Sequence, residues 1–362
     1  MDSEREAPQD GPADSMTVGS DATDIAVSVI MPVLNEGRHL RAAVRRVLGQ
    51  QWPGRLEVIL SVGPSRDDTS EIASALAEED PRVIVVANPS GRTPDALNRA
   101  VAAATGEVIV RVDGHAEIAD DYIATAVATL LETGADNVGG MMDARGVTIF
   151  ERAVAVAMKS PVGVGNSRFH VGGESGPTET VYLGVFRTET IRRIGGYDTR
   201  YTRAQDWEMN HRIRQAGGLV YFTPALRVVY RPRSTVSSLA RQYYDYGRWR
   251  RVVARRHRGT INARYLAAPS MVLGVAGAAL LGAWRPEALA VPCAYLAGTV
   301  LAGLHISRAE PPQVRALTPL VLMTMHWSWG LGFLLSTRDL SGATDDVAAA
   351  DGGVVGEVDR RA

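Results

Sequence analysis

The sequence contains a single cysteine, Cys293, among its 362 residues. One thiol excludes an intramolecular disulfide and any site with several thiolate ligands, and it favours a reducing compartment for the soluble part of the chain. The chain also lacks an excess of charge of one sign, because 39 lysines and arginines face 40 acidic residues and leave a formal net charge of −1. Phosphate binding normally requires a basic balance, so nucleic acid is not expected as the main partner.

The N-terminal residues lack the basic flank and apolar run of a signal peptide. Residues 1–25 are rich in Asp, Ser, Gly and Pro, and residues 337–362 are rich in Asp, Gly and Val. These compositions predict a disordered tail at each end. Hydrophobic residues, in contrast, make up 46% of the chain, which is enough for one sizeable core and a further apolar region.

Apolar runs of strand length alternate with helical patterns between residues 25 and 112. This alternation predicts an α/β domain in which helices flank a mixed, mostly parallel sheet. The expected strands are 25–33, 56–62, 83–87 and 107–112, and the expected helices are 38–50, 69–79 and 94–104. The stretch has neither of the glycine-rich loops that hold phosphates in Rossmann and P-loop domains, so a nucleotide must be held in another way.

Two aspartates are candidates for the chemistry of this domain. Asp113, in the triplet Asp113-Gly114-His115, follows the most apolar strand, and open parallel sheets bind ligands at such strand ends. A carboxylate there can hold Mg²⁺ or Mn²⁺ against a diphosphate, although it is equally often a turn former. Asp206 precedes a helical pattern, where it is either a helix N-cap or a base for an attacking sugar hydroxyl.

Three apolar stretches follow Arg264, at residues 266–284, 288–306 and 316–335. Each is close to the roughly 20 residues that cross a bilayer core of about 30 Å. We therefore expect a membrane region over residues 265–336 with two or three transmembrane helices, the alternative being buried core helices. The third stretch carries a histidine and two tryptophans, which also suit an interfacial position.

A basic and aromatic segment, residues 236–264, precedes this region and has six arginines between positions 248 and 258. Arginines interleaved with tyrosine and tryptophan predict an interfacial segment on anionic membrane lipid, with a solvated basic helix as the alternative. The positive-inside rule then places the catalytic domain in the cytoplasm, as part of a multi-pass protein of the inner (plasma) membrane.

Short motifs over about residues 26–230 resemble, in their order and spacing, the family 2 glycosyltransferases, which have the GT-A fold. The resemblance implies a catalytic domain over residues 26–235. The opening strand reads VSVIMPVLNE at 27–36, and it is followed by EVIL at 57–60, SRDDT at 65–69, ALNRA at 96–100, TGE at 105–107, the Asp113 triplet, GGYD at 195–198 and then Asp206. Within this family, the sequence looks like the succinoglycan-biosynthesis ExoA-type branch. The motifs that carry this likeness are DGHA at 113–116, TVYLG at 180–184, YGR at 246–248 and the apolar C-terminal region.

This resemblance implies an inverting, membrane-anchored enzyme that moves a sugar from a nucleotide-sugar donor to a lipid-linked saccharide acceptor in the synthesis of cell-surface polysaccharide. The implied donor-side residues are Pro32, Val33, Glu36, Arg92, Asn98 and Asp113. The implied base is Asp206, and Glu179, Gln205 and Trp207 are expected on the acceptor side. A divalent cation would bind at Asp113. The sequence departs from the family pattern at two points. His115 stands where a second metal-binding carboxylate is usual. Val62-Gly63 replaces an aspartate that contacts the nucleobase of the donor in many members, so a uridine donor is not implied.

Each of these residues also has a structural reading: Pro32 can simply end a strand, Glu36 can cap a helix and Arg92 can be a solvated charge. Two other functions fit the same pattern. One is a transferase that loads a sugar onto polyprenyl phosphate, and the other is a non-catalytic membrane subunit that binds a nucleotide sugar. The presence of both Asp113 and Asp206 favours an enzyme.

Overall fold

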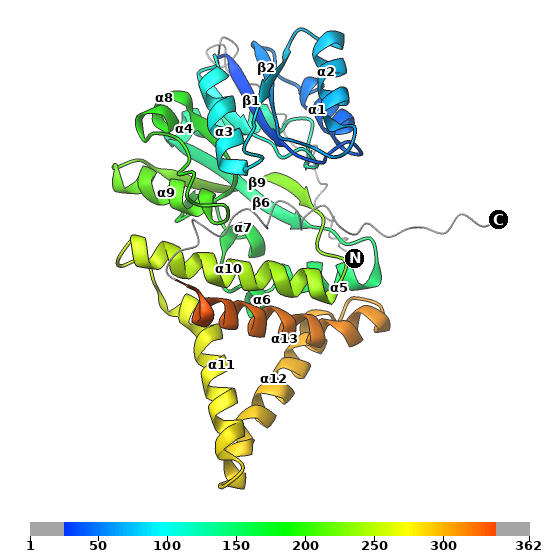
Figure 1. The fold of residues 1–362 in the computed structure, drawn as a ribbon, viewed down its shortest axis with the longest axis vertical. Helices are drawn as coiled ribbons and strands as arrows, with labels where there is room; N and C mark the ends of the chain where they lie inside the picture. Colours follow the sequence, from blue (N-terminus) through cyan, green and yellow to red (C-terminus); the bar gives the residue numbers. More distant parts are fainter. Residues whose placement is uncertain (1–24, 338–362) are drawn as a thin grey trace, which may run out of the picture.

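The computed structural model describes residues 25–337, and Figure 1 shows the arrangement of its elements. The two predicted tails, 1–25 and 337–362, lie outside the described residues except for Ile25 and Thr337. Three layers follow one another from top to bottom in this view: a sheet with its helices, a pair of long helices, and a helical hairpin.

A nine-stranded mixed sheet forms the upper layer, in the order β3-β2-β1-β4-β8-β6-β9-β5, with β7 paired to β9. The strands are β1 (Val27–Val33), β2 (Leu56–Val62), β3 (Val83–Ala87), β4 (Val108–Arg111), β5 (Glu117–Ile118), β6 (Asn137–Ala144), β7 (Gly176–Pro177), β8 (Tyr182–Arg187) and β9 (Val220–Tyr230). The first four pair in parallel, as predicted, whereas β8 runs antiparallel to both β4 and β6. The predicted α/β fold is confirmed, and its first four strands lie where the apolar runs placed them.

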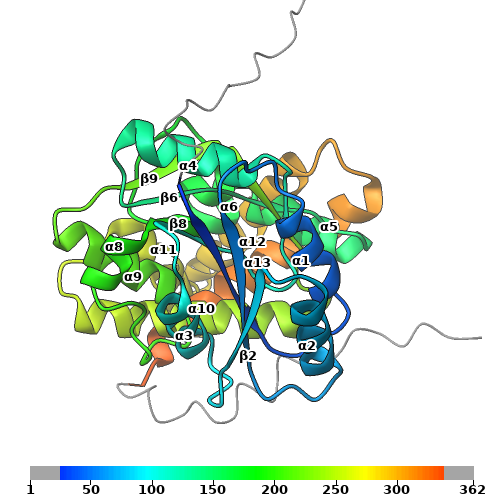
Figure 2. The same cartoon turned by 90° about the horizontal axis from the view of Figure 1, so that it is seen from above.

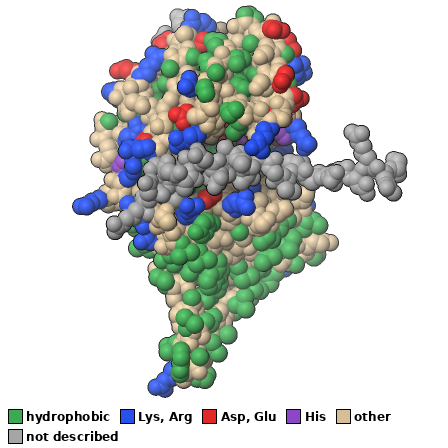
Figure 3. Space-filling model, viewed as in Figure 1, with side chains coloured by type: hydrophobic (Ala, Val, Ile, Leu, Met, Phe, Trp, Pro, Cys, Tyr) green, Lys and Arg blue, Asp and Glu red, His purple; other side chains and the backbone are tan. Residues whose placement is uncertain are grey.

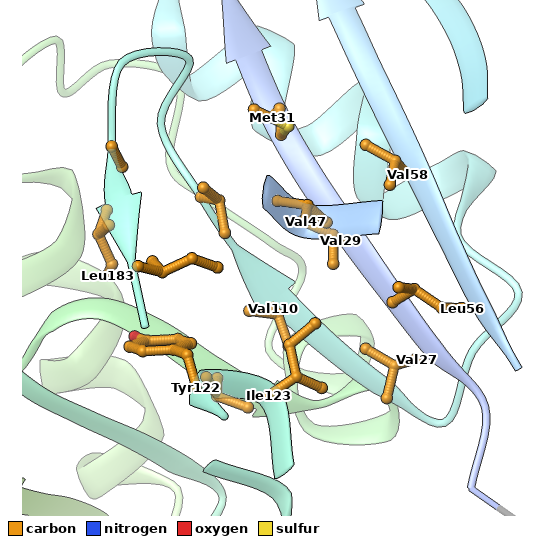
Figure 4. Close-up of a cluster of buried hydrophobic side chains, with 14 of the residues drawn as sticks. Val27, Val29, Met31, Val47, Leu56, Val58, Val110, Tyr122, Ile123 and Leu183 are labelled. Carbon is orange, nitrogen blue, oxygen red and sulfur yellow. The ribbon is translucent and has the colours of Figure 1, made fainter. Parts of the chain in front are cut away.

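Helices cover both faces of this sheet (Figure 2). One face is packed by α1 (Leu40–Leu48), α2 (Thr69–Glu79) and α4 (Tyr122–Thr133), and the other by α3 (Thr93–Ala103), α8 (Thr188–Arg193) and α9 (Gln205–Gln215). Strand β1 is buried on both sides, because Val29 packs into the first core and Ile30 into the second. Figure 4 shows the first core around β1. Burial on both faces explains why this strand reads as an unbroken apolar run.

The chain then builds a lower layer from helices that follow β6 and β9. The helices are α5 (Ile149–Met158), α6 (Pro161–Val164), α7 (Arg168–Val171), α10 (Val236–Arg256) and α13 (Pro312–Leu335). Helices α10 and α13 run side by side beneath the sheet (Figure 1). A third core, which includes Met142, Val154, Leu239 and Met325, joins β6, α5, α10 and α13. The sheet domain is thus fixed to α13 by apolar packing.

Below this layer, α11 (Ala263–Leu281), the 3-10 turn η2 (Pro286–Leu289) and α12 (Ala290–Ile306) form a hairpin. Two helical stretches, Ala263–Leu281 and Pro286–Ile306, are long and apolar enough to cross a membrane by length and composition. Their large side chains point outward: Leu273 is 62% exposed, Leu280 71% and Leu301 67%. Figure 3 shows this hydrophobic surface on the tapering lower part of the molecule.

The third apolar stretch, α13, lies across the base of the hairpin and packs along α10 (Figure 1). Among the described residues, α13 is not one of the stretches that pass this test of length and composition, and a third membrane crossing stays a prediction. The predicted interfacial segment 236–264 is also partly internal, since Tyr243 and Trp249 are buried. Arg251 donates to the Phe333 carbonyl at 3.0 Å and Arg255 to the Ser336 carbonyl at 3.0 Å. These arginines cap the C-terminal end of α13, where cations are favourable.

Glycines allow α10 and α13 to pack so closely that their backbones are in contact. A Cβ added to Gly332 would lie 2.0 Å from the Tyr244 carbonyl oxygen, and one added to Gly247 would lie 2.1 Å from that of Trp329. Both obstacles are backbone atoms, which cannot rotate away. The pairing of these two helices therefore requires glycine at both positions.

Replacing Gly332 by alanine is expected to lower stability by about 1–3 kcal/mol through overpacking, even though alanine favours helix. The matched control is Gly277→Ala in α11, where an added Cβ meets nothing within 4 Å. Thermal unfolding of each purified variant in detergent measures its melting temperature. Equal melting temperatures for the two variants would contradict the close packing of α10 on α13.

Candidate functional site

A buried arginine joins the two predicted carboxylates. Arg111, the last residue of β4, is 5% exposed in its side chain. Its Nε donates to Asp113 Oδ1 at 3.0 Å, and its Nη1 donates to Asp206 Oδ1. Residues that are 93 positions apart in the chain, Asp113 and Asp206, therefore share one cation at the end of a central strand. The sequence analysis identified both aspartates as candidates for the chemistry but did not identify the arginine that joins them.

The loop before α9 delivers Asp206 to this position. Gly195 and Gly196 have positive φ angles of 78° and 70°, and Ala204, directly before the helix, has a φ of 62°. The left-handed region is unfavourable for alanine, so the surrounding contacts must hold this turn. Asn98 supplies two of these contacts, because its amide donates to the Tyr197 carbonyl at 2.7 Å and accepts from the Tyr197 N–H at 2.7 Å.

Charge and burial oppose each other in this cluster. Burial raises the pKa of Asp206, and the nearby Arg111 lowers it, while the Asp113 charge raises it further. Burial alone would lower the pKa of Arg111, but Asp113 and Asp206 together hold it well above its ordinary range. Two carboxylates and one guanidinium leave a net charge of −1. A site with this charge can accept a further cation and, with it, an anionic ligand.

Tyr197 completes one wall of the cluster. Tyr197 is 2% exposed, and burial raises the pKa of its phenol, while the charge of Arg111 lowers this pKa and that of Asp206 raises it. The phenol therefore stays neutral at physiological pH. At the start of β8, burial likewise raises the pKa of Tyr182, which the charge of Asp113 raises further and that of Arg111 lowers. Neither tyrosine was predicted as a site residue, although both stand inside the GGYD and TVYLG motifs.

His115 pairs with Glu36 at the open side of the site. The ring nitrogen Nδ1 lies 2.7 Å from Glu36 Oε1, and this hydrogen bond raises the pKa of His115. The Glu36 backbone is fixed in turn, because its N–H donates to Thr69 Oγ1 at 2.8 Å. Since an ionised carboxylate only accepts, Nδ1 carries the hydrogen, and the neutral ring presents Nε2 to a ligand.

This arrangement fits a divalent cation held in part by the substrate. A carboxylate that accepts from one ring nitrogen is the usual partner of a metal-binding histidine, so Nε2 of His115 and the Asp113 carboxylate could both serve as ligands. Among residues 25–337, no group of three or more His, Cys, Asp or Glu side chains could hold a metal by itself. The remaining ligands would have to be phosphate oxygens and water, as Mg²⁺ and Mn²⁺ commonly have.

The other predicted donor-side residues are already engaged within the protein. Arg92, before α3, donates from Nη2 to the Thr199 carbonyl, and its Nε lies 3.9 Å from Asp95. Asn98 holds the loop at Tyr197. Val33 is 2% exposed and packs into the first core, so only its backbone could contact a nucleoside. Pro32, next to it in β1, is partly exposed.

The predicted acceptor-side residues lie around the start of α9 and the start of α11. Gln205 is the first residue of α9. Trp207 stacks on His211 with ring centroids 5.2 Å apart, and the Arg250 guanidinium lies 4.2 Å from its ring. Glu179, which is partly exposed, forms a 2.6 Å ion pair with Arg264 at the start of α11. The three residues therefore border the junction between the sheet domain and the hairpin.

Comparisons with known proteins identify the family and the fold of the chain. The model of glycosyl transferase family 2 matches residues 28–195. The succinoglycan biosynthesis protein ExoA of Rhizobium meliloti is 32% identical over 313 residues, which cover 86% of this chain and 94% of that protein. The solved structure of mannosyltransferase PcManGT from Pyrobaculum calidifontis, in complex with GDP-Man and Mn²⁺, matches with a TM-score of 0.55 at 22% identity, over 84% of this chain and 87% of that chain.

A more distant relative is a dolichyl N-acetyl-alpha-D-glucosaminyl phosphate glycosyltransferase of Methanococcus voltae, the 3-beta-D-2,3-diacetamido-2,3-dideoxy-beta-D-glucuronosyltransferase. It is 23% identical over 230 residues, which cover 61% of this chain and 71% of that protein. The identity to the ExoA protein extends over most of both chains, and the fold is the one that the GT-A resemblance predicted. The chain therefore belongs to glycosyltransferase family 2 and is a glycosyltransferase of the ExoA type with a GT-A fold.

Proposed function

We propose that this glycosyltransferase moves a sugar, with inversion of configuration, from a nucleotide-sugar donor to a hydroxyl of a lipid-linked saccharide in the synthesis of cell-surface polysaccharide. The observation that carries this proposal is the convergence of Asp113 and Asp206 on Arg111 at the end of β4. The similarity to a succinoglycan biosynthesis protein supports the class of product.

In the proposed reaction, Asp206 takes the proton of the acceptor hydroxyl as the oxygen attacks the anomeric carbon of the donor. The new bond forms on the face opposite the diphosphate, the bond between sugar and phosphate breaks, and the nucleoside diphosphate leaves. Burial raises the pKa of Asp206, and Arg111 opposes this shift and so favours the ionised form that a base requires. Asp113 lies on the side of the leaving group.

A divalent cation, when bound, would stabilise the negative charge that develops on the departing diphosphate. Asp113 and His115 are the residues proposed to hold it, and Glu36 orients the histidine. In the protonated form, His115 can instead donate a hydrogen bond to a phosphate oxygen.

We further propose that α11 and α12 cross the inner membrane and that the catalytic domain lies on its cytoplasmic face. The 19 residues of α11 have a length of about 28 Å, close to the roughly 30 Å of a bilayer core. Both open ends of the hairpin lie beside α13 and the arginine-rich α10 (Figure 1). A hairpin of this shape returns the chain to the side on which it entered, where the arginines favour the cytoplasm. A lipid-linked acceptor would reach the site at this junction.

Replacing Asp206 with asparagine tests the proposed base. The transfer rate should fall about 100- to 10,000-fold because no carboxylate remains to accept the proton. Donor affinity should change little, since Asp113 and Arg111 remain. The measurement is release of nucleoside diphosphate from a panel of nucleotide sugars by the protein in membranes with native lipid, together with equilibrium binding of the donor.

The matched control is Asp121→Asn, an exposed aspartate before α4 whose side chain makes no capping hydrogen bond. It should behave as the unchanged protein. Full transfer by the Asp206→Asn variant would remove Asp206 from the mechanism. Donor binding without turnover by the unchanged protein, under all donors and metals, would instead indicate a binding subunit.

The pH dependence of transfer should report on Arg111. Because Arg111 lowers the pKa of Asp206, the Arg111→Gln variant should protonate its base at higher pH. The acidic limb of the kcat profile should therefore move to higher pH, and activity at neutral pH should fall. Arg111→Lys retains a cation and should keep the limb near its original position. A limb that stays in place in Arg111→Gln, with the fold intact by thermal unfolding, would contradict the role of Arg111.

The pairing of Glu36 with His115 should control metal affinity. The Glu36→Gln variant should bind Mn²⁺ about 10- to 100-fold more weakly in the presence of nucleoside diphosphate, which electron paramagnetic resonance of free Mn²⁺ can measure. His115→Asp should shift the preference toward Mg²⁺, because carboxylate oxygen suits Mg²⁺ better than imidazole does. The control is His39→Gln on the exposed start of α1. Unchanged Mn²⁺ binding in Glu36→Gln would exclude this pair from the metal site.

A further inference from the structure

Arg250 of α10 is a buried cation held by aromatic rings. Its side chain belongs to a residue that is 6% exposed. The guanidinium carbon lies 4.2 Å from the ring centroid of Trp207 and 3.9 Å from that of Tyr265, and Nη2 donates to the Thr260 carbonyl. In the part of the chain that the structure describes, no carboxylate forms an ion pair with Arg250. Two ring faces and one carbonyl offset part of the lost hydration, while the buried Nε and Nη1 atoms have no hydrogen-bond partner among the described residues.

The two rings belong to elements with different tasks. Trp207 follows Asp206 in the first turn of α9, whereas Tyr265 lies in the first turn of α11, the first helix that could enter the membrane. Arg250 is the contact between them, from a third helix that runs beneath the sheet. A displacement of α11 relative to the sheet domain would thus act on the base-bearing turn through this cation.

The membrane side of this contact is itself held in place. Tyr265 stacks against Trp329 of α13 with centroids 6.4 Å apart, and the Arg264 guanidinium lies 4.6 Å from the Tyr265 ring. Arg264 also forms the 2.6 Å ion pair with Glu179 of the sheet domain. The start of α11 therefore contacts both α13 and the sheet domain at the same point.

On the catalytic side, tertiary contacts hold the turn into α9: Ala204 and Trp207 pack against a cluster that includes Trp249 and Val253 of α10, and Asp206 pairs with Arg111. Ala204 enters α9 in the left-handed region, and no side chain caps the helix. A strained turn without a cap depends on neighbouring contacts to keep its geometry. Among these contacts, the stack of Arg250 on Trp207 extends to α11, because the same guanidinium also lies over the Tyr265 ring.

We propose that Arg250 is a positioning residue that couples the seating of α11 in the membrane to the position of Asp206. The inference rests on the proposed function, in which Asp206 is the base. Arg250 does not touch the reacting atoms; it holds Trp207, and with it the first turn of α9. Arginine is suited to this task because its flat guanidinium stacks on two rings at once, which the ammonium of lysine cannot do.

The test is a double-mutant cycle on the protein in phospholipid vesicles. Arg250→Met and Tyr265→Leu should each lower kcat about 10- to 100-fold, as expected when a base is misplaced by a fraction of an ångström or more. Because both changes break the same contact, the double variant should be no slower than either single variant. Tyr265→Phe keeps the ring and should retain kcat, and the KM of the donor should stay the same in all of them.

The matched control is Arg248→Met, also on α10, whose contacts with Tyr244 at 5.6 Å and Asp245 at 3.5 Å remain within that helix. It should leave kcat unchanged. Hydrogen exchange of the backbone amides at 205–209 gives a readout that does not need turnover. Exchange there should be faster in Arg250→Met and in Tyr265→Leu than in the Arg248→Met control.

Three outcomes would overturn the coupling: unchanged kcat in Arg250→Met, multiplied losses of kcat in the double variant, or unchanged exchange at 205–209. A failure of the proposed function looks different, because the unchanged protein would then release no nucleoside diphosphate from any donor. In that case the exchange measurement alone decides whether Arg250 holds α9 to α11.

Discussion

The site depends on one interaction, the sharing of Arg111 between Asp113 and Asp206. Breaking a buried pair of this kind on one side commonly costs several kcal/mol, because a charge is left without a partner. The sheet places Arg111 at the end of β4, and the glycine-rich loop before α9 brings Asp206 to it. Burial raises the pKa of Asp206 and Arg111 opposes that shift, an environment that suits the base proposed here. Asn98 supports this arrangement by holding Tyr197 in the loop that leads to α9.

Much of the fold was predictable because its signals are local. Strands such as β2, Leu56–Val62, are apolar runs bounded by turn residues, so the predicted and observed limits coincide. The antiparallel β8 between β4 and β6 was not predictable in the same way. Strand order depends on pairing between distant segments, and β6 has a register shift between Val138 and Gly140. The transverse position of α13 also depends on tertiary contact, because its composition resembles that of α11 and α12 while the approach through Gly247 and Gly332 decides its direction.

In the candidate site, too, the residues with a local sequence signal were predictable and those that depend on tertiary contacts were not. Asp113 and Asp206 stand at a strand end and a helix start, positions at which sequence patterns are informative. Arg111 gave no such signal, since one arginine at the end of an apolar run looks like a boundary residue. Asn98 and Arg92 were assigned to the donor through the resemblance, and in the structure both hold the loop at 197–199. Their contacts within the protein depend on the tertiary fold, which no motif describes, and their role toward the donor stays a prediction.

A structure of the protein in a lipid nanodisc with a bound nucleoside diphosphate, determined by electron cryomicroscopy, tests the central claim most directly. The account predicts that the diphosphate lies on the Asp113 and His115 side of Arg111, that Asp206 faces the space beyond the terminal phosphate where the sugar would be, and that α11 and α12 lie within the lipid. A nucleotide bound elsewhere on the sheet, with Asp206 turned away from its phosphates, would contradict it.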